Sequence, residues 1–136
     1  MKFMVCYDGS EESKEALKTA RHHAKIWGAT LEVVNTLTRV EPLKHSAIKK
    51  AEDGLEAEVK EVLGGGDTAY AVQLLVTDVT SGEQMIKFAE EEKIDQIFIG
   101  IIKKSKVGKF LFGSTAQYVI LNGPCPVVTI QEYIPK

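Results

Sequence analysis

Short apolar runs alternate with longer segments of helical periodicity along the chain, and this alternation constrains the fold more than any other feature. The apolar runs lie near residues 3–7, 31–37, 70–76, 94–99 and 127–130. Such alternation is typical of βαβ units, in which helices connect neighbouring parallel strands and cover the sheet. We therefore predict a flavodoxin-like, doubly wound three-layer α/β sandwich with five parallel strands and four helices.

The expected helices have clear start and stop signals. Ser10 can cap a helix over 11–27, and Gly28 can end it in a left-handed conformation. Thr80 and Glu83 have the spacing of a capping box at the start of a third helix. Gly64 stops the helical pattern that begins near residue 41. The buried face of the first helix is expected to consist of Ala16, Leu17, Ala20, Ala24 and Trp27.

Length and charge exclude several classes of protein. A chain of 136 residues suits one domain, which we expect to span residues 1–136. A net charge of −2 gives no broadly basic surface for nucleic acid. The apolar runs are too short for a signal peptide or a membrane span. We therefore expect a cytoplasmic protein that binds neither nucleic acid nor membrane. Cys6 and Cys125 lack a metal or redox spacing and are expected to be free thiols.

The segment from Gly100 to Thr115 is the main candidate for a ligand site. Gly100 ends an apolar run, and Gly113 opens the next helical stretch. A helix N-terminus collects unpaired N–H groups and the positive end of the helix dipole, so it binds phosphate well. The intervening loop has four lysines within residues 103–109. We interpret it as a phosphate-facing loop, although such a charge run can also be simply solvated.

Two strand ends are expected to meet at this site. Ligands of open parallel sheets bind beyond the carboxyl ends of the strands, where neighbouring connections leave on opposite faces. Asp8 follows the first apolar run as Gly100 follows the fourth. We predict the strand order 3-2-1-4-5, because it places both residues at one crevice.

The chain resembles the universal stress protein family over nearly its whole length. The resemblance rests on Val5 to Ser10 and on the stretch from Ile99 through Gly113 and Ser114 to Val128. The nucleotide motif of that family has a glycine, another glycine three residues on, and a glycine with serine or threonine ten residues after that. Gly100 and the Gly113-Ser114 pair match it, whereas Lys103 occupies the middle glycine position.

The resemblance implies a site for ATP or a related adenine nucleotide. By that resemblance, Asp8 lines the nucleoside part and Thr36 contacts adenine. The implied nucleotide-binding residues are Tyr7, Asp8, Thr36, Ile99, Gly100, Gly113, Ser114 and Thr115. No metal site is expected from protein groups alone. Asp8 can either hold Mg²⁺ through bound phosphates or act only as a partner of the first helix dipole.

Lys103 leaves two alternatives open. It either fills the phosphate pocket or supplies a charge that replaces the missing backbone contacts, since its Cβ excludes much of the positive-φ region. The favoured function is a cytoplasmic stress-response protein that binds an adenine nucleotide or another anionic metabolite and signals as a homodimer. The alternatives are a dimeric scaffold without nucleotide and a slow ATPase or phosphoryl-transfer enzyme. No catalytic residue is assigned, because the sequence offers no recognisable general base or triad.

The last strand is expected to form the dimer interface. It is nearly continuous in apolar residues although it should lie at a sheet edge, where unpaired backbone groups invite another chain. The family resemblance also implies dimerisation through this strand. The expected interface residues are Val127, Val128, Thr129 and Ile130.

Overall fold

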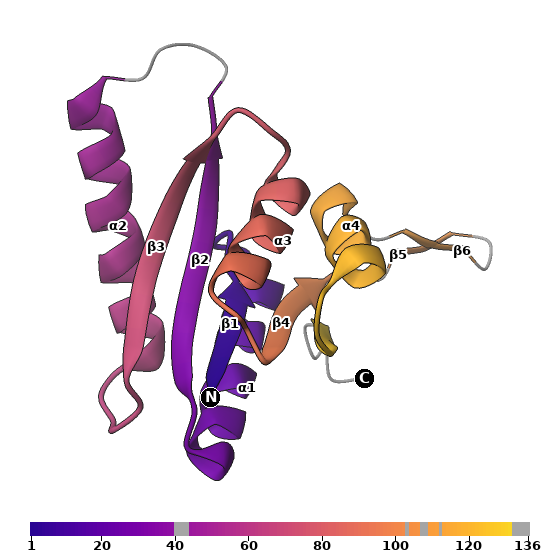
Figure 1. The fold of residues 1–136 in the computed structure, drawn as a ribbon, viewed down its shortest axis with the longest axis horizontal. Helices are drawn as coiled ribbons and strands as arrows, with labels where there is room; N and C mark the ends of the chain where they lie inside the picture. The colour runs from indigo at the N-terminus through magenta and orange to yellow at the C-terminus, as the bar shows by residue number, and fades with distance from the viewer. Residues whose placement is uncertain (40–43, 103, 107–108, 112, 132–136) are drawn as a thin grey trace.

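The computed structural model describes residues 1–39, 44–102, 104–106, 109–111 and 113–131. Its main sheet has five parallel strands in the order β3-β2-β1-β4-β7 (Figure 1). Counted along the chain, these five strands have the predicted order 3-2-1-4-5. The strands are β1 (Lys2–Cys6), β2 (Thr30–Thr38), β3 (Tyr70–Thr77), β4 (Gln96–Ile101) and β7 (Val127–Gln131).

Helices cover both faces of the sheet. Helices α1 (Glu11–Trp27) and α2 (His45–Leu63) pack on one face, and α3 (Ser81–Glu91) and α4 (Ser114–Asn122) pack on the other (Figure 1). The predicted three-layer, doubly wound α/β architecture is therefore confirmed. Of the helices described, none combines the length and the apolar character that crossing a membrane requires.

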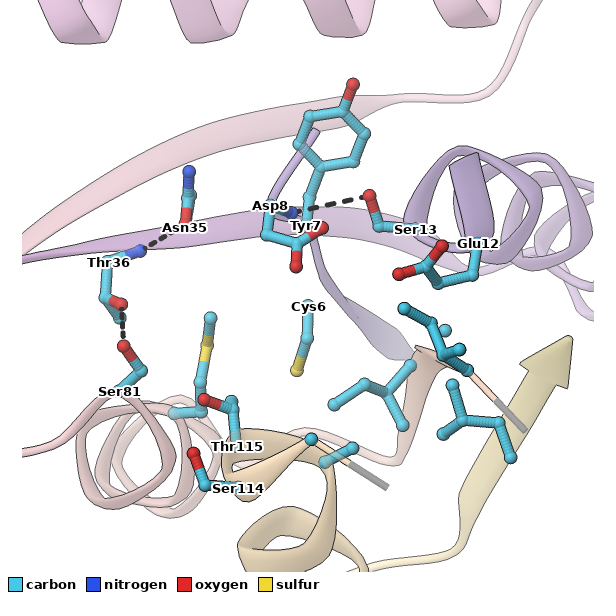
Figure 2. Close-up of a pocket in the computed structure, with 17 residues that line it drawn as sticks. Cys6, Tyr7, Asp8, Glu12, Ser13, Asn35, Thr36, Ser81, Ser114 and Thr115 are labelled. Atoms are coloured by element: carbon cyan, nitrogen blue, oxygen red, sulfur yellow. Dashed lines mark hydrogen bonds between the residues drawn. The ribbon is translucent and has the colours of Figure 1, made fainter. Parts of the chain in front are cut away.

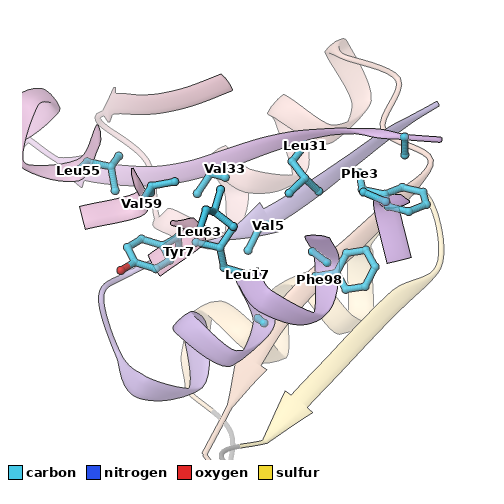
Figure 3. Packing of buried hydrophobic residues seen from close by; sticks show 14 residues of the cluster. Phe3, Val5, Tyr7, Leu17, Leu31, Val33, Leu55, Val59, Leu63 and Phe98 are labelled. Atoms are coloured by element: carbon cyan, nitrogen blue, oxygen red, sulfur yellow. The ribbon is translucent and has the colours of Figure 1, made fainter. Parts of the chain in front are cut away.

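Two apolar clusters hold the three layers together. On the α1 and α2 side, Phe3 and Val5 of β1 and Tyr7, just after it, pack with Leu17 of α1 and Val59 of α2 (Figure 3). On the other side, Met4 and Cys6 pack with apolar residues of α3 and α4. Alternate residues of β1 thus enter opposite clusters, as the period of two in a strand requires. Strand β1 is buried on both faces and lies at the centre of the fold.

The helix ends follow the local signals. The Ser10 hydroxyl accepts a hydrogen bond from the Ser13 amide at 3.2 Å, and the Thr80 hydroxyl accepts one from the Glu83 amide at 3.2 Å. Gly28 ends α1 with φ of 66°, in the left-handed region. These three predictions of helix boundaries are confirmed.

Three details differ from the sequence-based expectations. Trp27 is 64% exposed, because the last turn of α1 extends beyond the amino end of β1 (Figure 1). Strand β2 continues to Thr38, because β3 pairs with it as far as Thr77, so Thr36 lies inside β2. The segment expected as a loop contains an antiparallel hairpin of β5 (Lys104–Lys106) and β6 (Lys109–Leu111). Its lysines hid the strand signal, since lysine is depleted in strands.

Gly100 permits a close approach between β4 and the first turn of α1. A Cβ at Gly100 would lie 2.4 Å from the carbonyl carbon and oxygen of Glu12, and 2.7 Å from the amide nitrogen of Ser13. These are backbone atoms at the start of a helix, so they cannot move aside as a side chain can. The glycine is therefore required by packing.

We predict that Gly100→Ala destabilises the protein by about 2 kcal/mol or more, because the added methyl group overpacks a fixed contact. Gly113→Ala is the matched control, since Gly113 has φ of −61° and a Cβ there meets nothing within 4 Å. The control should lower the free energy of unfolding by no more than about 1 kcal/mol, which is the usual cost of alanine at an N-cap. Urea denaturation measures both. Equal stability of the two variants would show that the approach at Gly100 is not a constraint.

Candidate functional site

A cavity of about 290 Å³ opens at the carboxyl ends of the central strands (Figure 2). The structure brings all eight residues of the predicted nucleotide set to its lining. These residues are Tyr7, Asp8, Thr36, Ile99, Gly100, Gly113, Ser114 and Thr115. Lys103, the predicted phosphate contact, lies outside the described residues. Residues predicted from four separate segments of the chain therefore line the same cavity.

Asp8 is held in place by the start of α1. The Ser10 amide donates to Asp8 Oδ1 at 3.0 Å, and the Ser10 hydroxyl donates to the same oxygen. The Asp8 amide donates to Ser13 Oγ at 3.4 Å. Partial burial raises the pKa of Asp8, but the hydrogen bonds from Ser10 and Ser13 outweigh it, so the pKa lies below its ordinary value. Asp8 is thus a fixed carboxylate near neutral pH.

Glu12 adds a second carboxylate to the cavity lining (Figure 2). Glu12 was not among the predicted site residues, because an acidic residue in the first turn of a helix is already accounted for by the helix dipole. The spacing of Asp8 and Glu12 could have suggested it, because both lie at the turn that enters α1. Among the described residues, no group of three or more His, Cys, Asp or Glu side chains could hold a metal ion.

The N-terminus of α4 forms the opposite part of the lining. Gly113 is its N-cap and supplies no side-chain hydrogen bond, and the first turn has no acidic residue. Helices α1 and α3, by contrast, are capped by hydroxyl groups and have acidic residues in the first turn. Helix α4 therefore lacks the first-turn acid that opposes the dipole in α1 and α3, and its positive end lies at a cavity that Asp8 and Glu12 also line.

Gly113 is not required by the fold. Its φ of −61° suits any residue, and a Cβ would meet no atom of the described residues within 4 Å. It also lines the cavity, so a side chain there would take up space beside the helix N-terminus. The glycine keeps this approach open, which is the condition that a phosphate needs to reach backbone amides.

The third part of the lining is polar and comes from β2 and α3. The Thr36 hydroxyl donates to Ser81 Oγ at 2.7 Å, and the Thr36 amide donates to Asn35 Oδ1 at 2.8 Å. Thr36 reaches the cavity because β2 continues past β1, whose Cys6 pairs with Val34. Asn35 and Ser81 were not expected here. In sequence Ser81 is only the residue after the Thr80 cap, and its pairing with Thr36 depends on the strand register.

The inner wall of the cavity is apolar and contains a thiol. Met85 and Ile99 line it, and Cys6 points its sulfur into the same space (Figure 2). Burial, together with the charge of Asp8, raises the pKa of Cys6 to about 12, so the group stays a neutral thiol. The expectation of free cysteines is confirmed, with Cys6 buried and Cys125 half-buried.

Tyr7 contributes its backbone to the cavity, and its ring lies on the other face of the sheet (Figure 2). The Tyr7 hydroxyl donates to Glu58 Oε1 at 2.7 Å. Burial, with the hydrogen bond and the charge of Glu58, raises the pKa of Tyr7 above its ordinary value. This bond fixes α2 to the end of β1, immediately before Asp8.

Fold and site together define a doubly wound α/β protein with a ligand crevice at the carboxyl edge of its sheet, suited to a phosphate-bearing compound. The chain belongs to the universal stress protein family, which it matches over residues 1–131. The family predicted from the motif residues is thereby confirmed.

Known relatives agree with this assignment over almost their full length. The Thermus aquaticus protein named universal stress protein in QAH/OAS sulfhydrylase 3'region is 29% identical over 133 residues, covering 94% of this chain and 96% of the relative. A universal stress protein structure from Archaeoglobus fulgidus has a TM-score of 0.81 at 31% identity, covering 96% and 98%. Another, from the same organism in complex with dAMP, has a TM-score of 0.75 at 27% identity, covering 96% and 97%.

We predict that Ser10→Ala costs about 1 kcal/mol through the lost cap and also raises the pKa of Asp8. In the native protein the Asp8 pKa lies below its ordinary value of 3.8, so Asp8 adds stability above that pH, and the gain disappears as the pH falls through the lowered pKa. The difference between wild type and Ser10→Ala should therefore be larger at pH 7 than near pH 2.

Thr80→Ala is the control for this experiment, because it removes a similar cap from α3 without touching Asp8. Its cost should be the same at both pH values. Urea unfolding across the pH range measures both differences. Parallel curves for the two variants would show that Ser10 does not hold the Asp8 charge.

Proposed function

We propose that this protein binds ATP or a related adenine nucleotide in the cavity at the carboxyl ends of β1, β2 and β4. The carrying observation is the uncapped N-terminus of α4, which opens onto a cavity that Asp8 and Thr36 also line. A phosphate at α4 would meet unpaired amides and the positive end of the dipole. The dAMP complex of a relative at 27% identity supports the same ligand class.

The polarity of the lining suggests an orientation for the nucleotide. Phosphates belong at Gly113, Ser114 and Thr115, where the amides are unopposed. The base belongs near Thr36, where hydroxyl and amide groups lie beside the apolar side chain of Met85. The ribose would then lie near Asp8, whose carboxylate can accept from ribose hydroxyl groups. The cavity volume is close to the lower end of the roughly 300–1,000 Å³ typical of small-molecule sites.

Magnesium would fit this arrangement as a companion of the phosphates. Asp8 and Glu12 both line the cavity, and Mg²⁺ is commonly held by one or two carboxylates with phosphate oxygens. The ion would offset the repulsion between these carboxylates and the nucleotide. Lys103 remains a proposed phosphate contact on the sequence alone.

The described lining favours binding over catalysis. Cys6 is held as a neutral thiol, and the Tyr7 hydroxyl lies on the other face of the sheet, where it is hydrogen-bonded to Glu58. Asp8 has a lowered pKa, which makes it a weak general base at neutral pH. We therefore propose that the protein is a nucleotide-binding protein of the cytoplasm and that its nucleotide-bound form acts as a signal in the stress response. On this proposal it is not an enzyme with fast turnover.

We predict that Gly113→Val weakens ATP·Mg and dAMP binding at least tenfold, because its side chain enters the space beside the α4 amides. The fold should tolerate it, since the position is open. Gly54→Val on α2 is the matched control, because a Cβ there also meets nothing within 4 Å. Calorimetric titration measures affinity, and phosphate release measures turnover.

Three outcomes would oppose the proposal. Unchanged affinity in Gly113→Val would place the phosphates elsewhere. Absence of binding to the wild-type protein would favour a scaffold without nucleotide. Many turnovers per minute that disappear in Gly113→Val would favour a phosphoryl-transfer enzyme.

We further propose that the protein forms a homodimer through β7. This strand lies at the edge of the five-stranded sheet beside β4, and its sequence is rich in apolar residues. Val127, Val128 and Ile130 are only half-buried in the single chain. An edge of this kind gains hydrogen bonds and apolar contacts when a second copy pairs with it.

We predict that Val128→Lys converts the dimer into a monomer, since a lysine at an edge strand opposes pairing. Val72→Lys on β3 is the matched control, because Val72 is also half-buried against the α1 and α2 cluster but lies on the opposite edge. Light scattering at micromolar concentration gives the molecular mass. The proposed interface would be contradicted if the wild-type protein is a monomer, or if Val128→Lys and Val72→Lys dissociate the dimer to the same extent.

A further inference from the structure

A second cavity, of about 230 Å³, lies at the amino end of the sheet, away from the candidate nucleotide site. It is formed where α2 ends and β3 begins. Its lining includes Arg21 of α1, Lys60 of α2, the 64–66 glycine segment, Thr68 and Tyr70. The two cavities share no lining residue. A ligand here would therefore occupy a site separate from that of the nucleotide.

The lining of this cavity is positively charged. Arg21 and Lys60 both reach it, and none of the residues that line it is acidic. Within the described chain, neither cation has a carboxylate oxygen within 4.0 Å. Arg21 donates to the Leu63 carbonyl. A guanidinium has five N–H donors, so most of them remain for a ligand.

Neutral donors complete the cavity. The hydroxyl oxygen of Thr68 is buried and has no partner within the described part of the chain. The amides of Gly65 and Gly66 donate to no described backbone carbonyl, and neither residue has a side chain that would cover them. A buried hydroxyl without a partner costs free energy, and rotation of the Thr68 side chain toward the cavity would let an acceptor there recover it.

We propose that this cavity binds a small tetrahedral oxyanion of the phosphate type. Charge-assisted hydrogen bonds from Arg21 and Lys60 would hold it. The Thr68 hydroxyl and the amides of Gly65 and Gly66 would donate further hydrogen bonds to its oxygens. The carbonyl groups at the end of α2 would repel an anion only weakly, because two of them accept hydrogen bonds. The Lys60 carbonyl accepts one from the Gly64 amide at 2.9 Å, and the Leu63 carbonyl accepts one from Arg21.

The test is a titration of the full chain with inorganic phosphate, followed by amide NMR shifts, against sodium chloride at equal ionic strength. We expect saturable shifts at Gly65, Gly66 and Thr68. Lys60→Gln should weaken this binding roughly tenfold, as expected for a charged hydrogen bond. Lys87→Gln, at an exposed lysine of α3 on the opposite face of the sheet, is the charge-matched control and should leave the affinity unchanged.

Arg21→Lys is a second variant, which keeps the charge but loses the fork geometry, and it should also weaken phosphate binding. The proposal is overturned if chloride produces the same shifts, if the shifts are confined to Ser114 and Thr115, or if Lys60→Gln binds phosphate as the wild type does. Because Lys60 lies outside the nucleotide cavity, dAMP affinity in Lys60→Gln reports separately on the proposed function.

Discussion

The close contact between Gly100 and the first turn of α1 is the constraint on which the candidate site depends. Because Gly100 has no Cβ, the backbone of Glu12 and Ser13 can rest directly on the end of β4. That contact brings the Ser10 hydroxyl beside the Asp8 carboxylate, to which it donates, and the Ser13 hydroxyl beside the Asp8 amide, from which it accepts. It also brings Glu12 to the cavity. In this chain the first glycine of the family motif is therefore a packing requirement as well as a candidate ligand residue, and its presence alone says little about nucleotide binding.

Gly113 gives the opposite kind of information. Neither its backbone angles nor its neighbours require glycine, so the fold gains nothing from it. The helix that it precedes lacks both a hydroxyl cap and a first-turn acid, features that stabilise α1 and α3. A glycine N-cap costs only about a few tenths of a kcal/mol relative to a hydroxyl cap, and the missing first-turn acid gives up a further ~0.3–1 kcal/mol. Local departures from stabilising rules commonly mark functional positions. The electrostatics of α4 thus argue for an anionic ligand more directly than the motif does.

The fold was predictable because its signals are local. Apolar runs, the Ser10 and Thr80 caps and the Gly28 stop each specify a boundary from a few neighbouring residues. The predicted nucleotide residues also reach one cavity, since the carboxyl ends of parallel strands meet. Asn35 and Ser81 were not predictable, because their place depends on how far β2 continues past β1. That distance is set by pairing with β3, which no short stretch of sequence encodes. The predicted burial of Trp27 was wrong for a related reason. Periodicity places a residue on a face of α1 but does not say where the sheet beneath that face ends.

The polarity of the layers explains why both ends of this sheet can attract anions, for different reasons. Helix N-termini point to the carboxyl edge, so α4 supplies positive charge there without a basic side chain. Helix C-termini point to the amino edge, where the negative end of α2 alone would repel an anion. That helix end amounts to about −0.5 of an elementary charge. Arg21 and Lys60 together bring two positive charges to the same cavity, which is more than neutralising the helix end requires. Capping of α2 alone therefore does not explain the remaining positive charge. It lies beside the buried Thr68 hydroxyl, which has no partner among the described residues.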